Sequence, residues 1–154
     1  MPYLIRLTSL LMVLILALSC KSKPAEATTV YPYLPPISQA DLEAIAVESP
    51  SGDLIYNDFG ISMAYPDQTA VRNSLSYIRA GEIVEANSCS PSARIFYNDS
   101  QGNLMREMDL YIAGGCLHMV YLQDGQPMSA SPLNNTGAEF YTRIVQQFLE
   151  QNGQ

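Results

Sequence analysis

Short apolar runs alternate with clusters of turn residues through the second half of this chain, and that pattern restricts it to a fold that contains a sheet. Asn98 to Asn103, then Gly114 and Gly115, separate the runs, and residues 123–126 (Gln-Asp-Gly-Gln) are typical of a two-residue hairpin turn. Connections this short join antiparallel neighbours, so the pattern predicts a β-meander. The runs that we interpret as strands cover residues 93–97, 104–112 and 116–122.

Helices are predicted on both sides of this stretch. A capping-box pattern at residues 38–41 begins a short helix near 39–47, and a second helix is expected over about 68–80. A second capping-box pattern at 136–139 begins a terminal helix with two adjacent apolar rows. We therefore predict an α+β fold, in which an antiparallel β-meander sheet is packed by two or three helices including a C-terminal amphipathic helix.

The first twenty residues differ from the rest of the chain. One positive charge, Arg6, precedes an apolar run from Leu10 to Leu18, and the small residue Ser19 stands before Cys20. A charged start, a short apolar run and a small residue before a cut are the parts of a secretory signal peptide. The run is too short for a transmembrane helix, which needs roughly 20 apolar residues.

The sequence Ala17-Leu18-Ser19-Cys20 makes this segment resemble the signal of a bacterial lipoprotein. The resemblance implies cleavage before Cys20 and acylation there, with palmitate-type chains that together anchor the protein stably in a membrane. Lys21, where an Asp would retain the protein in the inner membrane, implies the outer membrane in a cell that has one. A secreted protein cut near residues 25–27 and an uncleaved anchor are the open alternatives.

The chain divides into three predicted segments: a signal peptide (1–19), a lipidated cysteine with a proline-rich tether (20–36) and a single α+β domain (37–154). Tyr31, Tyr33 and Leu34 make the tether more apolar than a pure spacer, so they either dock on the domain or form a recognition segment.

The net charge of the chain after residue 19 bears on whether it can bind nucleic acid. Without residues 1–19 the chain keeps seven basic and fifteen acidic residues, a net charge of −8, and no lysine follows Lys23. Binding to phosphate backbones needs a basic surface, so we expect no nucleic-acid partner.

Cys89 and Cys116 are the cysteines that remain once Cys20 is lipidated. A pair of cysteines in an exported protein usually forms a disulfide. Cys89 lies at the entrance to one predicted strand and Cys116 at the start of another, and such strand ends can be neighbours. We therefore predict a Cys89–Cys116 disulfide, which would contribute about 3.5 kcal/mol by closing the loop between them.

The sequence contains no complete catalytic or metal-binding pattern, so we expect no catalytic residue, metal or cofactor. His118 is the only histidine, and a Cys–His metal site needs three or four ligands, so we expect a partly buried structural histidine. Glu107 and Asp109 share a predicted strand face with Tyr111, which we interpret as the solvated side.

Tyrosine is the enriched aromatic residue, with ten copies and no tryptophan. Tyr97, Tyr111 and Tyr121 lie on predicted strands and are candidates for a binding surface, although tyrosines in such strands also build cores.

Taken together, these features predict a membrane-anchored lipoprotein with a non-enzymatic binding or accessory domain in the cell envelope. Its partner would be an envelope protein or a secreted hydrolase that it inhibits. The rival is a small-molecule-binding or carboxylate-based enzymatic lipoprotein, whose buried carboxylates a sequence cannot reveal.

Overall fold

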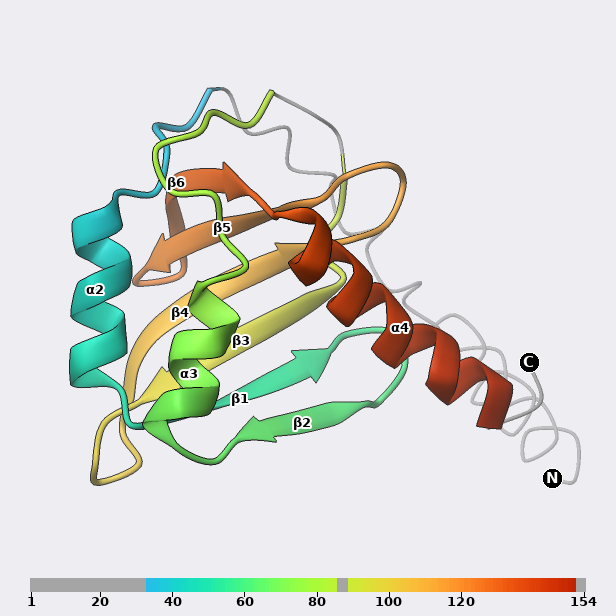
Figure 1. The fold of residues 1–154 in the computed structure, drawn as a ribbon, viewed down its shortest axis with the longest axis horizontal. Helices are drawn as coiled ribbons and strands as arrows, with labels where there is room; N and C mark the ends of the chain where they lie inside the picture. Colours follow the sequence, from blue (N-terminus) through green and yellow to red (C-terminus); the bar gives the residue numbers. More distant parts are fainter. Residues whose placement is uncertain (1–32, 86–88, 152–154) are drawn as a thin grey trace, which may run out of the picture.

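The computed structural model describes residues 33–85 and 89–151 of the chain. The predicted signal peptide, Cys20 and the tether up to residue 32 lie outside these ranges. The described residues form a six-stranded sheet with helices packed on it, which confirms the predicted α+β fold (Figure 1). No described helix is long and apolar enough to cross a membrane.

The sheet is antiparallel throughout, with its strands in the order β2-β1-β3-β4-β5-β6. Strands β3 to β6 follow the chain as the predicted meander, whereas β2 folds back on the outer side of β1. In the β5–β6 turn Asp124 and Gly125 have φ angles of 51° and 73°, as a two-residue hairpin requires. The strands are β1 (Ser51–Tyr56), β2 (Ser62–Tyr65), β3 (Ala93–Asn98), β4 (Leu104–Tyr111), β5 (His118–Gln123) and β6 (Gln126–Pro132).

The described helices are α2 (Gln39–Glu48), α3 (Gln68–Leu75) and α4 (Asn135–Gln151). The capping box predicted for the first of them is present. The Ser38 Oγ accepts a hydrogen bond from the Asp41 N–H (3.1 Å), and the Asp41 carboxylate accepts one from the Ser38 N–H (3.4 Å). Two of the N–H groups that a helix start leaves unpaired are thus satisfied.

Helix α3 ends five residues earlier than the sequence predicts. After Leu75 the chain leaves the helix to pair with the end of β6: Ile78 forms an isolated bridge with Leu133, and the Arg79 N–H donates to the Pro132 carbonyl (2.9 Å). This long-range pairing replaces the last helical turn that the local apolar spacing favours.

Helix α4 begins near the predicted place but with a different cap. Asn134, not Thr136, caps it, because the Asn134 Oδ1 accepts a hydrogen bond from the Gly137 N–H (2.8 Å). The Asn134 N–H and side-chain amide also donate to the carbonyls of Tyr77 and Ser76, at 2.8 and 2.9 Å. These bonds hold Asn134 at the end of α3 and fix the helix start.

The main core lies between the sheet and the three helices. Alternate residues of the strands point into it, and Tyr97 and Tyr141 are fully buried there. Their hydroxyls have partners: Tyr97 with the Ser74 hydroxyl (3.2 Å) and Tyr141 with that of Tyr65 (3.4 Å). Burial raises the pKa of the Tyr97 hydroxyl well above its ordinary value, so the group stays neutral and able to donate.

A second core lies on the other face of the sheet, over β4, β5 and β6. It consists of five buried residues, with Leu34, Val84 and Cys89 packed against them. The predicted disulfide joins Cys89 to Cys116 with a Cα–Cα distance of 6.5 Å, and it holds the chain before β3 against this core. The five buried residues are Tyr111, Cys116, Val120, Leu122 and Ala130.

Candidate functional site

The β1–β3–β4 part of the face that bears the second core is not covered by a described helix. Helices α2, α3 and α4 all contribute to the main core on the opposite face (Figure 1). Strand register places Asp53 beside Phe96, Ile55 beside Arg94 and Phe96 beside Glu107. We call these five side chains the open face.

The open face combines apolar and charged groups. Ile55 is 44% exposed near the end of β1, Phe96 is half-buried at the diagonal position on β3, and Asp53 is exposed. A solvated face of an antiparallel sheet is ordinarily polar, so two apolar residues on adjacent strands depart from the usual pattern.

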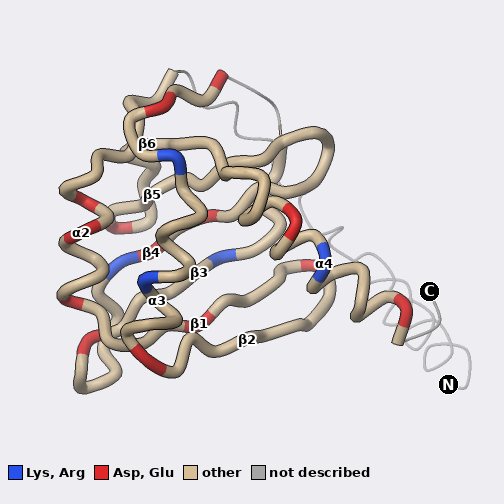
Figure 2. The backbone as a smooth tube through the Cα atoms, in the orientation of Figure 1, with Lys and Arg blue, Asp and Glu red and all other residues tan. Residues whose placement is uncertain are grey.

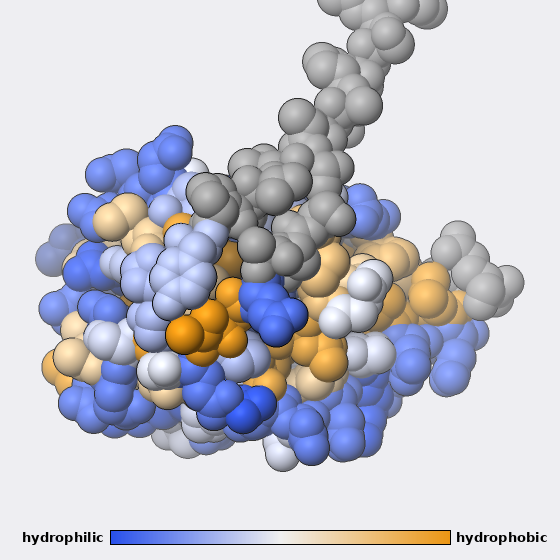
Figure 3. Space-filling view, turned by 90° about the horizontal axis from the view of Figure 1, so that it is seen from above, coloured by the Kyte–Doolittle hydropathy of each residue, from blue (hydrophilic) through white to orange (hydrophobic). Residues whose placement is uncertain are grey.

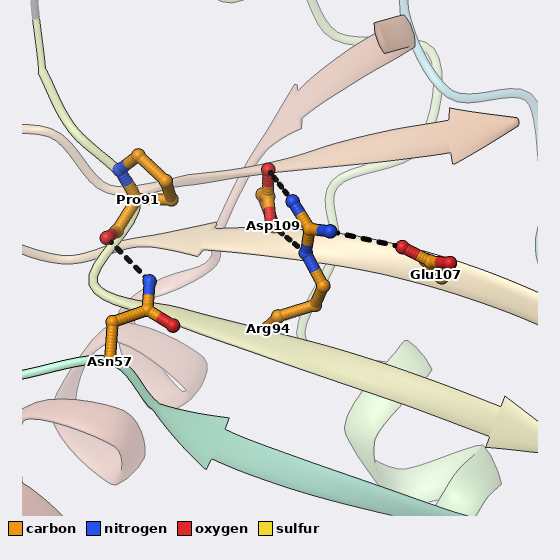
Figure 4. A network of polar contacts seen from close by, with 5 residues as sticks. All are labelled: Asn57, Pro91, Arg94, Glu107 and Asp109. Atoms are coloured by element: carbon orange, nitrogen blue, oxygen red, sulfur yellow. Dashed lines mark hydrogen bonds and ion pairs between the residues drawn. The ribbon is translucent and has the colours of Figure 1, made fainter. Parts of the chain in front are cut away.

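Arg94 lies at the centre of an ion cluster on this face (Figure 4). Its Nε and Nη2 donate to the two Asp109 carboxylate oxygens at 2.7 and 3.1 Å, and its Nη1 donates to Glu107 Oε2 at 3.2 Å. The register explains this geometry, because Arg94 pairs directly with Asp109 and Glu107 is the diagonal neighbour. The fork of the guanidinium matches the carboxylate and fixes both side chains.

The expectation that Asp109 and Tyr111 face solvent is wrong. Asp109 is 3% exposed and Tyr111 is 1% exposed, whereas Glu107 is partly exposed. Alternation places the three residues on one face of β4, but the second core covers the end of the strand that contains Tyr111. The face is therefore solvated at one end and buried at the other.

The ion cluster carries a net charge of −1, because one guanidinium meets two carboxylates, and Asp53 adds a further negative charge to the open face. Figure 2 shows the same imbalance over the described chain, with few basic positions and acidic ones spread over several elements. The open face can therefore offer an apolar centre with an acidic rim to a partner.

A pocket of about 350 Å³ opens beside this face, where β4 and β5 diverge. Their pairing stops at Glu107 and Leu122, although β4 begins three residues earlier. Tyr121 and Asp124 also line the pocket, and its wall residue Arg106 is paired with Glu48 of α2 (Nη2–Oε2 3.2 Å). The pocket combines backbone groups of the diverging strands with two carboxylates, which suits a small polar molecule.

His118 is a buried structural residue that lies outside this pocket. It is 5% exposed and stacks on Tyr111, with ring centroids 4.4 Å apart and planes 13° from parallel. Burial lowers the pKa of His118 to about 4, so the ring is neutral near pH 7.

The three candidate tyrosines do not form one binding surface. Tyr97 is fully buried in the main core, and Tyr111 is buried in the second core on the opposite face. Tyr121 is half-buried, points toward the main core and lines the pocket. Strand alternation separates them, because register pairs Tyr121 with Met108 of the helix-covered face and Tyr111 with His118 of the other.

Among the described residues, no group of three His, Cys, Asp or Glu side chains could hold a metal ion. Comparison with protein-family models, curated proteins and solved structures finds no match to this chain.

Proposed function

We propose that this chain is an exported lipoprotein, anchored through Cys20, whose α+β domain is a non-enzymatic binding or accessory module of the cell envelope. In a cell with two membranes its place is the outer membrane. The partner docks on the open face.

One observation carries this proposal: Ile55 and Phe96, which are diagonal neighbours on β1 and β3, are the apolar centre of a sheet face that no described helix covers. Covering such a centre removes apolar area from water, which favours association by about 25 cal/mol for each Å² buried. Apolar centres surrounded by polar groups are typical of protein–protein interfaces.

Charge indicates the partner's chemistry. Asp53 and Glu107 give the open face an acidic rim, while Arg94 is engaged with its carboxylates. A complementary partner has an apolar contact surrounded by Lys or Arg, since opposite potentials increase both specificity and the association rate. A basic secreted hydrolase that the domain inhibits and a basic subunit of an envelope complex both fit.

Site-specific photo-cross-linking in cells tests the docking surface. A benzophenone residue at position 55 should give a discrete protein adduct, whereas one at Val47, which is 66% exposed on α2, should give none. Asp53→Arg should abolish the adduct, and Glu43→Arg on α2 should leave it unchanged. Equal cross-linking from positions 47 and 55, or none from either, would contradict the proposal.

The alternative is a small-molecule-binding or carboxylate-based enzymatic lipoprotein, and the pocket between β4 and β5 is the feature that favours it. A thermal-shift screen of the mature protein against polar metabolites tests this function. A ligand whose stabilising effect is lost in Glu107→Gln and kept in Glu43→Gln would favour the alternative.

A further inference from the structure

Three segments far apart in the sequence meet at the last residues of β6. The Ala130 N–H donates to the Pro35 carbonyl (2.9 Å), which fixes the segment before α2. The Ser131 hydroxyl accepts from the Ile37 N–H (2.9 Å) and donates to the Glu82 carbonyl (3.1 Å), so one side chain holds two of the segments together.

The third segment is the one before β5. The Leu133 N–H donates to the Leu117 carbonyl (2.9 Å), and the neighbouring Cys116 is held to Cys89 by the disulfide. The chain around residues 33–37, 82–84 and 116–117 therefore forms one fixed end of the domain.

Exposed apolar side chains gather at this end. Tyr33 is 66% exposed, Ile83 55% and Leu117 44%, and we call these three residues the tether-end patch. Leu34 and Val84 pack inward on the second core, which leaves Tyr33 and Ile83 directed outward. Figure 3 looks onto this end of the molecule and shows apolar side chains gathered near its centre.

Chain length determines what lies near the patch. Only twelve residues separate Cys20 from Tyr33, and twelve extended residues reach at most about 40 Å. Acyl chains on Cys20 would therefore keep the point where the chain enters the domain within about 40 Å of the bilayer. The tether-end patch lies at that point.

We infer that the tether-end patch docks on the bilayer that holds the lipid anchor, an inference that rests on the proposed lipidation of Cys20. Tyr is a preferred residue of membrane interfaces, and Ile and Leu can enter the acyl boundary. Glu85 and the ion pair between Arg79 and Glu82 adjoin the patch, a net charge of −1. The patch therefore contacts a zwitterionic lipid surface. Anionic lipid repels the acidic charge beside the patch and weakens this contact. With the patch on the bilayer, the end of the domain that contains residues 33–37, 82–84 and 116–117 faces the membrane.

The absence of tryptophan from the chain allows a direct test. The acylated full-length mature protein is prepared with a single tryptophan, as Ile83→Trp or Leu117→Trp, in phosphatidylcholine vesicles with brominated acyl chains. Ile55→Trp on the open face and Val47→Trp on α2 are matched controls, since all four positions are exposed. The fluorescence should be quenched and blue-shifted at positions 83 and 117 and should not change at 47 and 55.

Vesicle flotation of the same samples distinguishes the two proposals, with Cys20→Ser as the unanchored reference. If the acylated protein floats and positions 83 and 117 are not quenched, or all four positions are quenched equally, docking is overturned and the anchor stands. If the processed protein carries no lipid and does not float, both proposals fail. Thermal melts of each variant that match wild type establish that the variants are folded.

Discussion

Mild acid should destabilise this protein through one residue, His118. The ring is buried at the start of β5 and stacked on Tyr111. Burial opposes the charged form, which lowers the pKa of His118 from 6.5 to about 4 in the folded protein. The unfolded chain keeps a value near 6.5.

The sign and size of the effect follow from this difference. Between pH 6.5 and 4 the unfolded chain binds a proton that the folded protein does not, so the free energy of unfolding falls as pH falls. One pKa unit is worth about 1.4 kcal/mol, so the full difference is about 3.5 kcal/mol. Because a folded protein can relax and admit water to a buried charge, which reduces the full penalty, we expect losses of about 1 kcal/mol at pH 5.5 and about 2 kcal/mol at pH 4.5.

Urea unfolding of wild type and His118→Phe measures this loss. Carboxylates titrate in both proteins, so their contribution cancels when the two unfolding free energies are subtracted. The phenyl ring keeps the stack on Tyr111 and cannot bind a proton. The difference should change by about 2 kcal/mol in favour of the variant between about pH 7.5 and pH 4.5. A difference independent of pH would refute the burial of an uncharged ring.

Three further outcomes are expected from urea or thermal unfolding. Replacing both disulfide cysteines with alanine should lower the free energy of unfolding by about 3.5 kcal/mol, and reductant should weaken wild type alone; equal stability with and without the bond would contradict its role. Arg94→Met leaves the Asp109 carboxylate buried without its main partner and should lower the free energy of unfolding by about 2–4 kcal/mol. The double variant Arg94→Met/Asp109→Leu should recover most of this loss, and additive losses would refute the coupling. Gly137→Ala would place its Cβ 2.9 Å from Tyr77 Cγ and should destabilise by about 1–3 kcal/mol, in contrast to an alanine at the exposed Glu139; a stabilised variant would show that the helix can shift.

Local patterns predict the elements of this fold well because local chemistry determines them. The turn at residues 123–126 needs two positive φ angles, which Asp124 and Gly125 provide. The capping box at Ser38 satisfies N–H groups within one helical turn. The disulfide follows from the number of cysteines that remain after Cys20 and from their places before two strands.

Features set by long-range contacts could not be predicted in this way. Helix α3 ends early because Ile78 pairs with Leu133, which lies 55 residues further along the chain. Asp109 alternates like a solvated residue, yet it is 3% exposed and paired with Arg94 of the neighbouring strand. Alternation along a strand shows which residues share a face of the sheet. It does not show what packs on that face.

The open face was also missed, although the sequence carries a signal for it. In β3 the run Ile95-Phe96-Tyr97 is apolar on both faces, as in a strand buried on two sides, although Arg94 is charged. In the described structure helices cover one of those faces, and Phe96 lies half-buried on the other. An apolar residue on an otherwise charged strand face is therefore the signal that sequence analysis could use.

The proposed location and the docking on the bilayer both depend on processing and lipid attachment at Cys20. Mass spectrometry of the N-terminal peptide from membrane-extracted protein measures both. We expect a peptide that begins at Cys20 and carries a diacylglyceryl group on sulfur, together with an acyl chain on the new amino terminus. A peptide that begins at Met1, or a soluble protein that begins near residue 28 without lipid, would contradict it.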